Sequence, residues 1–128
     1  MTSSDSSLEV LPLTQQTLWQ ILEDQVSDLA VNQLLWQSLG YQHQDGQWDI
    51  SHVEAYWAEK FPTPPDFIGS RPATVHLTRS IPQENKQLLK TYLGFKGYTV
   101  DQLQPRLTRR ATAVSWLLSY MKAQGMLA

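Results

Sequence analysis

The 128-residue sequence contains no cysteine, which excludes disulfide bonds, thiolate nucleophiles, cysteine-based zinc fingers and iron–sulfur clusters. It also lacks the GxxxxGK[ST] and GxGxxG patterns that hold nucleotide phosphates, and the GxSxG pattern of a nucleophile elbow. Its only histidines, His43, His52 and His76, do not have the spacing of metal ligands. We therefore expect a protein that is not an enzyme and that uses neither a metal nor a cofactor.

Long hydrophobic runs are absent too, since no apolar stretch approaches the roughly 18 residues of a membrane-spanning helix. Residues 1–10, MTSSDSSLEV, have neither the basic start nor the apolar stretch of a secretory signal. Hydrophobic residues make up 41% of the chain and five are tryptophan, which is enough for one core. We expect a cytoplasmic protein with a disordered tail over residues 1–10 and a single compact helical domain over residues 11–128.

Lysine and arginine are missing from the first 59 residues, whose nine acidic residues give that part a formal charge of −9. Residues 60–128 hold ten basic and three acidic residues, so their charge is 10 − 3 = +7. Two interpretations stay open. The two parts can fold together with opposite charges as neighbours, which is the simpler one, or a basic surface can face an anionic partner.

The first part of the domain is predicted to be a pair of helices forming a helical hairpin. Thr14 is placed to cap the first helix, whose apolar residues follow at spacings of three and four. Ser27 is placed to cap the second, and Gly40 stands where the left-handed residue that ends a helix belongs.

A small β-hairpin near residues 41–50 should follow, because an Asp-Gly pair within that segment favours a type I′ turn. Ser51 and Glu54 have the spacing of a capping box, which predicts a third helix beginning there. That helix should end before Pro62, since the residue preceding a proline is disfavoured in helical geometry.

The proline-rich segment 61–73 is the main candidate for a linker. Phe61, Phe67 and Ile68 give it apolar anchors, so we expect a stiff segment lying over the body of the domain. Residues 74–78 fit a short strand by their β-branched alternation and a helical turn by the proline that precedes them.

Two more helices complete the predicted fold. Ser80 and Gln83 have the spacing of another capping box, and Gly94 is a stop signal. Residues 105–125 form the longest helical pattern, with an apolar face so wide that this helix belongs at the centre of the core. The sequence thus predicts a mainly α-helical single domain of about five helices with one small β-hairpin.

Three arginines, Arg106, Arg109 and Arg110, have the spacing that brings side chains to one side of a helix. The helix dipole disfavours cations at this N-terminal end, so the cluster needs an acidic neighbour or a bound anion. Three explanations stay open: pairing with acidic residues of the same chain, an acidic protein partner, and a nucleic acid or phosphorylated ligand. Internal pairing is the simplest of the three.

The predicted function is binding to another protein through this cluster. The predicted contact residues are Arg106, Arg109, Arg110 and Lys96, with an aromatic edge from Phe95, Tyr98 or Phe67. The aromatic residues could also form a groove for a partner's peptide, with segment 61–72 as a wall and arginine at the rim. The competing hypothesis is a nucleic-acid-binding regulator that uses the same arginines; it is disfavoured because the last helix uses most of its positions for packing.

Several strings carry a resemblance to a known family. They are VNQLLWQSLGY at 31–41, RPAT at 71–74, TRSIPQENKQLLK at 78–90, LGFKGY at 93–98 and TRRATAVSWLLSY at 108–120. The chain resembles the DUF1823 family, short proteins of oxygenic phototrophs, chiefly cyanobacteria, whose function is unknown. The resemblance implies a cyanobacterial, cytosolic setting and no reaction. We expect a non-enzymatic assembly or regulatory factor, linked to a photosynthetic or carboxysome assembly, and no oligomeric state is implied.

Overall fold

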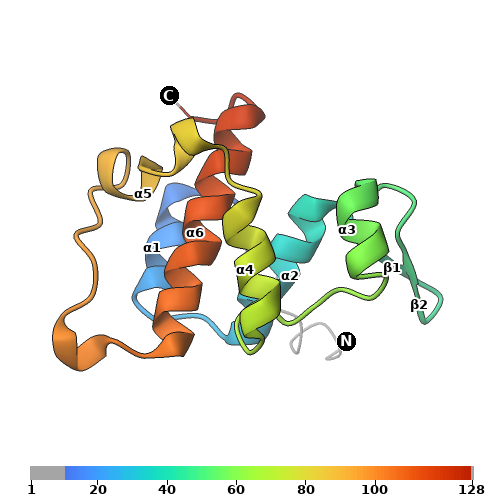
Figure 1. Ribbon diagram of the computed structural model, residues 1–128, viewed down its shortest axis with the longest axis horizontal. Helices are drawn as coiled ribbons and strands as arrows, with labels where there is room; N and C mark the ends of the chain where they lie inside the picture. Colours follow the sequence, from blue (N-terminus) through green and yellow to red (C-terminus); the bar gives the residue numbers. More distant parts are fainter. Residues whose placement is uncertain (1–10, 128) are drawn as a thin grey trace, which may run out of the picture.

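The computed structural model describes residues 11–127, so the tail predicted over residues 1–10 lies outside the described residues. The described chain contains six α-helices, a two-stranded hairpin and two short 3-10 helices (Figure 1). The elements are α1 (Gln15–Leu22), α2 (Asp28–Leu39), β1 (Gln42–Gln44), β2 (Gln47–Asp49), α3 (Ala55–Lys60), α4 (Arg71–Arg79), η2 (Gln83–Asn85), α5 (Leu88–Thr91), η3 (Val100–Gln102) and α6 (Pro105–Ala123). The predicted mainly helical fold with one small hairpin is confirmed.

Helix α6 is the centre of the core, as its wide apolar face predicts. Helices α1, α2, α4 and α5 all pack against it, and Figure 1 shows α6 between α1 and α4. Leu117 and Leu118 on α6 are completely buried, and full burial of such a side chain contributes about 2 kcal/mol. Helices α1 and α2 are therefore joined mainly through α6, rather than chiefly to each other as a helical hairpin would be.

The predicted ends of the first two helices are confirmed. The Thr14 hydroxyl oxygen accepts a hydrogen bond from the Thr17 N–H at 3.2 Å, and the Ser27 hydroxyl oxygen accepts one from the Ala30 N–H at 3.1 Å. Gly40 ends α2 with a φ of 105°, a conformation that favours glycine. A Cβ atom at this position would lie 2.5 Å from the carbonyl oxygen of His52, so the turn also needs the missing side chain.

The β-hairpin is also where the sequence predicts it. Strands β1 and β2 pair antiparallel with His43 opposite Trp48, and the turn residues Asp45 and Gly46 have φ values of 51° and 78°. The Trp48 ring packs edge-on against Trp36 of α2, with ring centroids 5.7 Å apart. This contact anchors the hairpin to the helical body.

The capping box predicted at Ser51 is wrong. The Ser51 N–H donates instead to Asp49 Oδ1 at 2.9 Å, which holds residues 49–51 in a turn. Glu54 precedes the first residue of α3 but makes no capping bond through its side chain. The helix therefore starts at Ala55, later than predicted, although it does end before Pro62.

The capping box predicted at Ser80 is wrong for a different reason. Ser80 closes α4: its hydroxyl donates to the Leu77 carbonyl at 2.8 Å and accepts from Trp116 Nε1–H at 2.9 Å. Gln83 belongs to η2, so the predicted single helix is broken into η2 and the short α5. The open choice for residues 74–78 is resolved as helix, within α4.

The proline-rich segment lies over the body, as its apolar anchors predict. Phe67 and Ile68 are buried, and the Asn32 side chain holds the segment from α2. Asn32 Oδ1 accepts from the Phe67 N–H and Asn32 Nδ2 donates to Asp66 Oδ1, both at 2.8 Å. Burial opposes ionisation of Asp66, but hydrogen bonds from the Gly69 N–H, the Asn32 amide and the Ile68 N–H lower its pKa overall.

Within residues 11–127 there is no helix whose length and apolar character would let it cross a membrane.

Candidate functional site

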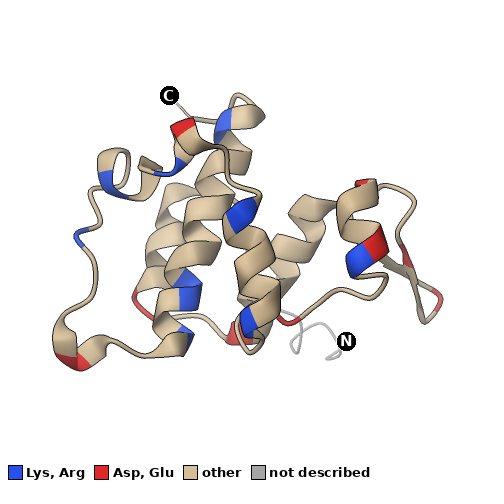
Figure 2. Ribbon diagram, in the orientation of Figure 1, with Lys and Arg blue, Asp and Glu red and all other residues tan. Residues whose placement is uncertain are grey.

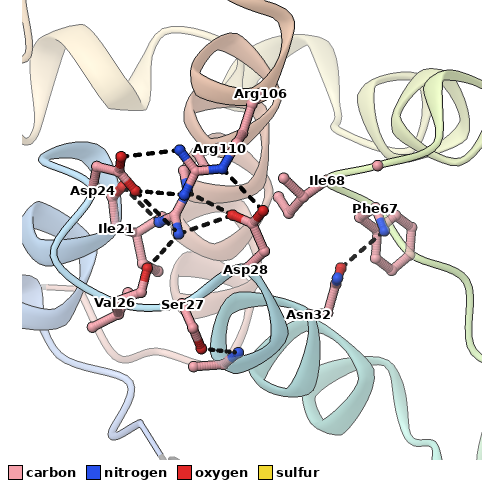
Figure 3. Close-up of polar contacts among 12 residues, drawn as sticks. Ile21, Asp24, Val26, Ser27, Asp28, Asn32, Phe67, Ile68, Arg106 and Arg110 are labelled. Atoms are coloured by element: carbon pink, nitrogen blue, oxygen red, sulfur yellow. Dashed lines mark hydrogen bonds and ion pairs between the residues drawn. The ribbon is translucent and has the colours of Figure 1, made fainter.

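Two of the three predicted arginines are paired inside the molecule, with aspartates at the turn between α1 and α2 (Figure 3). Arg106 Nη1 and Nη2 donate to the two carboxylate oxygens of Asp24 at 2.9 and 2.7 Å, and Arg106 Nε donates to Asp28 Oδ2 at 3.0 Å. This bidentate geometry is the strong form of an arginine–carboxylate pair.

Arg110 is completely buried, whereas the Arg106 side chain is 42% exposed. Its Nη2 lies 3.0 Å from Asp28 Oδ1 and also donates to the Val26 carbonyl, while its Nη1 donates to the Ile21 carbonyl at 3.2 Å. A buried charge is costly unless it is paired and hydrogen-bonded, and both conditions are met here. Arg110 therefore fastens α6 to the turn between α1 and α2.

The pKa shifts agree with this geometry. The hydrogen bond from Arg106 lowers the pKa of Asp24, with further lowering from the nearby charges of Arg106 and Arg110 against the opposing effect of burial. The hydrogen bonds from Arg106 to Asp24 and Asp28 raise the pKa of Arg106 above its usual value. The Asp24–Arg106 pair consequently stays charged at neutral pH.

The expectation that the arginines face a partner is thus wrong for Arg106 and Arg110, whose internal pairing is confirmed. It is also wrong for Phe67, which is only 1% exposed and packs edge-on against Trp57. Arg109 differs from its neighbours. It is half-buried, donates from Nη1 to the Ile68 carbonyl at 3.1 Å and makes no ion pair with any described residue.

The remaining predicted contact residues, Lys96, Phe95 and Tyr98, lie together. They line a cavity of about 430 Å³ between α5, the segment that follows it and α6. Lys86 and Lys90 line the same cavity, which we call the lysine groove. No acidic residue is among the described residues that line it.

The apolar side of the lysine groove is fixed by contacts with α1. Phe95 packs edge-on against Trp19, with ring centroids 6.1 Å apart, and against Tyr98 at 5.1 Å. The Tyr98 hydroxyl donates to the Leu22 carbonyl at 2.8 Å, and burial raises the pKa of Tyr98. These contacts hold the wall of the groove against the helical body. Leu103, by contrast, lines the groove with 58% of its surface exposed.

The lysines differ in how firmly they are held. Lys86 Nζ donates to the Thr78 carbonyl at 3.2 Å. Lys90 and Lys96 are exposed and make no ion pair with any residue that the structure describes. Two positive charges at the groove are therefore available to an anionic ligand.

A second cavity of about 430 Å³ continues this basic surface. It is lined by Arg71 and Arg109 and shares Leu103 and Thr108 with the lysine groove. Figure 2 shows basic residues on α5, on the segment after it and at the start of α6, and acidic residues at η2 and η3. These two acidic residues, Glu84 and Asp101, line neither cavity.

An aromatic cavity also exists, but not with the predicted walls. About 410 Å³ in volume, it lies between α2 and the hairpin and is lined by Trp36, Tyr41 and Trp48 among others. Neither an arginine nor any residue of the segment 61–72 is among the described residues that line it.

The predicted contact set leaves out most of the groove lining, including Lys86, Leu89, Lys90 and Leu103. Lys86 and Lys90 have a spacing of four, which on a continuous helix would place them on one face. The break between η2 and α5 makes that simple pattern unreliable here. Leu103 lies outside any helix and carries no periodic signal.

One family model matches nearly the whole chain. The family model described as "Domain of unknown function (DUF1823)" matches residues 12–122. A protein with a solution NMR structure is 49% identical in sequence, and the match covers 91% of this chain and 99% of that one with a TM-score of 0.78. No curated protein matches the chain significantly. The family predicted from the sequence strings is therefore confirmed, and this chain belongs to the DUF1823 family.

Proposed function

We propose that the protein is a non-enzymatic docking factor that binds an acidic segment of a partner protein in the lysine groove. The observation that carries the proposal is the combination of unpaired cations with apolar surface. Lys90 and Lys96 make no ion pair within the described chain, and the partly exposed Leu103 lies in the same cavity.

The chemistry of the groove indicates what such a segment contains. An exposed ion pair contributes only about 0–1 kcal/mol, so charge alone gives weak binding. Apolar surface adds roughly 25 cal/mol for each Å² removed from water, so a large apolar side chain on Leu103 and Phe95 would add to the affinity. The expected ligand is a segment with several carboxylates around one or two large apolar residues.

The cellular role is part of the same proposal. The family resemblance suggests a cyanobacterial setting, where a docking factor of this kind would assist the assembly or regulation of a photosynthetic or carboxysome complex. A binding groove without a reaction fits such a role.

Nucleic-acid binding is the alternative function. Arg106 and Arg110 are already held by aspartates, and α6 lies in the core rather than offering an exposed recognition face. The chain also carries a formal net charge of −2, whereas nucleic-acid-binding domains are usually strongly basic. These features favour an acidic protein segment as the ligand.

The test is an NMR titration of the ¹⁵N-labelled protein with a short helical peptide of glutamate and leucine. Its control peptide carries glutamine at every glutamate position. We expect saturable shifts at Lys90, Lys96 and Leu103 with the acidic peptide and binding about tenfold weaker with the glutamine peptide, since 1.4 kcal/mol corresponds to a factor of ten. Equal binding of the two peptides would contradict the proposal.

A matched pair of variants locates the site. Lys90→Glu/Lys96→Glu should lose about tenfold in affinity for the acidic peptide, because two attractions become repulsions. Lys60→Glu/Lys122→Glu changes the net charge equally at exposed lysines outside the groove and should bind like the wild type. An oligonucleotide that binds more tightly than the peptide, and is lost in the groove variant, would favour the alternative.

A further inference from the structure

The aromatic cavity between α2 and the hairpin is separate from the lysine groove. Figure 1 shows α5 and the hairpin on opposite sides of α6. The rings of Trp36, Tyr41, His43 and Trp48 line the cavity, and its polar lining consists of the neutral glutamines Gln33, Gln37 and Gln42. The lining set contains no charged residue among those described, with the histidine counted as neutral.

The polar atoms of two of these rings are already used. Trp36 Nε1–H donates to the Pro65 carbonyl at 2.7 Å, and the Tyr41 hydroxyl donates to the Phe61 carbonyl at 2.7 Å. Both acceptors belong to the proline-rich segment that lies over the body. What these rings offer a ligand is therefore mainly their π surface.

The ring arrangement gives the cavity two differently oriented aromatic walls. The planes of Trp36 and Trp48 are 75° apart with centroids at 5.7 Å, and the His43 ring lies 4.8 Å from Trp48 at 58°. Ring faces carry negative electrostatic potential and attract cations that lie over them. The same part of the fold already shows this interaction, because Lys60 Nζ lies 5.0 Å from the Tyr56 ring centroid.

The surroundings of the cavity carry negative charge. Residues 42–60 contain four acidic residues, Asp45, Asp49, Glu54 and Glu59, and one basic residue, Lys60, so their formal charge is 1 − 4 = −3. Asp49 pairs across the hairpin with Gln42, a lining residue, and accepts the Ser51 N–H. Figure 2 shows the hairpin with acidic residues and no basic ones. A cation approaching the cavity is therefore attracted, and an anion is repelled.

We propose that this cavity binds an arginine or lysine side chain from a basic segment of a partner protein. The cation lies against the aromatic walls, and the hairpin carboxylates hold the flanking charges of the segment. The cavity proposal stands on its own residues and does not depend on the lysine groove. Only its extension, that the protein connects a basic segment to an acidic one at opposite sides of α6, rests on the proposed function as well.

The test is an NMR titration that follows the indole signals of Trp36 and Trp48 and the backbone signal of His43. The probe is a short capped peptide of arginine and glycine, and its control contains citrulline, which has the same shape as arginine without the charge. We expect saturable shifts at these residues with the arginine peptide and binding about fivefold weaker with the citrulline peptide. Equal binding of both peptides would overturn the proposal, as would shifts confined to other parts of the protein.

Variants separate the charge from the rings. Asp45→Asn/Asp49→Asn keeps residues that tolerate the turn and should weaken binding of the arginine peptide about threefold. Glu23→Gln/Glu84→Gln removes the same charge at exposed sites outside the cavity and should leave binding unchanged. Equal losses in the two variants would show an effect of net charge only and would overturn the site.

The ring contribution has its own variant. Trp48→Leu should abolish the saturable shifts in a variant whose hairpin signals remain dispersed, which shows that the hairpin is still folded. If the hairpin unfolds in this variant, the Asp45→Asn/Asp49→Asn variant tests the proposal instead. A neutral proline-rich peptide is the third probe, because aromatic grooves also bind such segments. Tighter binding of that peptide than of the arginine peptide would overturn the cationic ligand.

Discussion

The start of α6 and the region around α5 are both rich in cations, but they use them differently. At the start of α6, Arg106 and Arg110 meet Asp24 and Asp28 from the turn between α1 and α2. Around α5, the charges of Lys90 and Lys96 meet no carboxylate of the described chain. The first group is paired inside the fold, and the second group makes no ion pair within the described chain.

The difference teaches that a cluster of basic residues in a sequence does not by itself show whether the cations pair inside the fold or remain unpaired. The acidic residues that the fold brings next to them decide this. Asp24 and Asp28 lie at a turn that α1 and α2 bring against the first turns of α6 (Figure 3). No acidic residue is among the described residues that line the lysine groove beside α5. Asp24 and Asp28 of the acidic first part of the sequence are thus paired with arginines at the turn between α1 and α2. The acidic residues of the hairpin have no such partners among the described residues.

The largest effect should come from breaking the buried arginine. Arg110→Met should lower the free energy of unfolding by about 3 kcal/mol, because it removes the partner of two carboxylates and the donor to two carbonyls. Urea denaturation measures the loss. Arg109→Met is the control, since it removes one hydrogen bond to a carbonyl and should cost about 1 kcal/mol. Equal losses of unfolding free energy in the two variants would contradict the conclusion that Arg110, unlike Arg109, is a buried ion-pair partner.

Removing the outer arginine should cost less. The Arg106 side chain is 42% exposed and its partner Asp24 43%, so water screens the pair. Arg106→Gln should therefore lower the free energy of unfolding by about 1 kcal/mol. Urea denaturation checks this value as well. A loss as large as that of Arg110→Met would show that burial does not set the difference in stability contribution between Arg106 and Arg110.

Acid should weaken the arginine cluster further. The pKa of Asp24 in the folded protein is lowered, so its contribution to stability is present above the ordinary value of 3.8 and is lost as the pH falls through the lower folded pKa. In Asp24→Asn the stability should fall less steeply over that range. Asp45→Asn removes an acid that makes no ion pair within the described chain and should keep the wild-type slope; thermal unfolding from pH 6 downward compares them.

The smallest effect on stability should come from the lysines. Lys90→Gln/Lys96→Gln should change the free energy of unfolding by less than about 0.5 kcal/mol, because exposed side chains without partners contribute little. A loss above 1 kcal/mol in urea denaturation would mean that these lysines support the fold after all.

Short-range signals allowed much of the fold to be predicted. Thr14 and Ser27 cap helices because each hydroxyl oxygen reaches an N–H three residues later, and the Asp45 turn needs only its two central residues. Ser51 and Ser80 begin segments with the spacing of capping boxes, but their polar groups bond elsewhere. The Ser51 N–H donates to Asp49, and the Ser80 hydroxyl bonds to Leu77 and Trp116. Such competition depends on the tertiary structure or on an adjacent turn.

The candidate site was harder to predict for a related reason. The sequence shows that Arg110 is basic, but its partner Asp28 is 82 residues away and only the packing of α2 on α6 brings them together. Lys96, Phe95 and Tyr98 line one groove because they are close in sequence, and their contact with a partner stays a prediction. Lys86 and Leu103 join them only through the path of the chain around α5.

The measurement that tests the account most directly is a fluorescence-anisotropy titration of the labelled acidic peptide. It compares the wild type, Lys90→Gln/Lys96→Gln and Arg106→Gln under one salt condition. The account predicts several-fold weaker binding to the lysine variant and unchanged binding to the arginine variant. Weaker binding to Arg106→Gln with an unaffected lysine variant would contradict it.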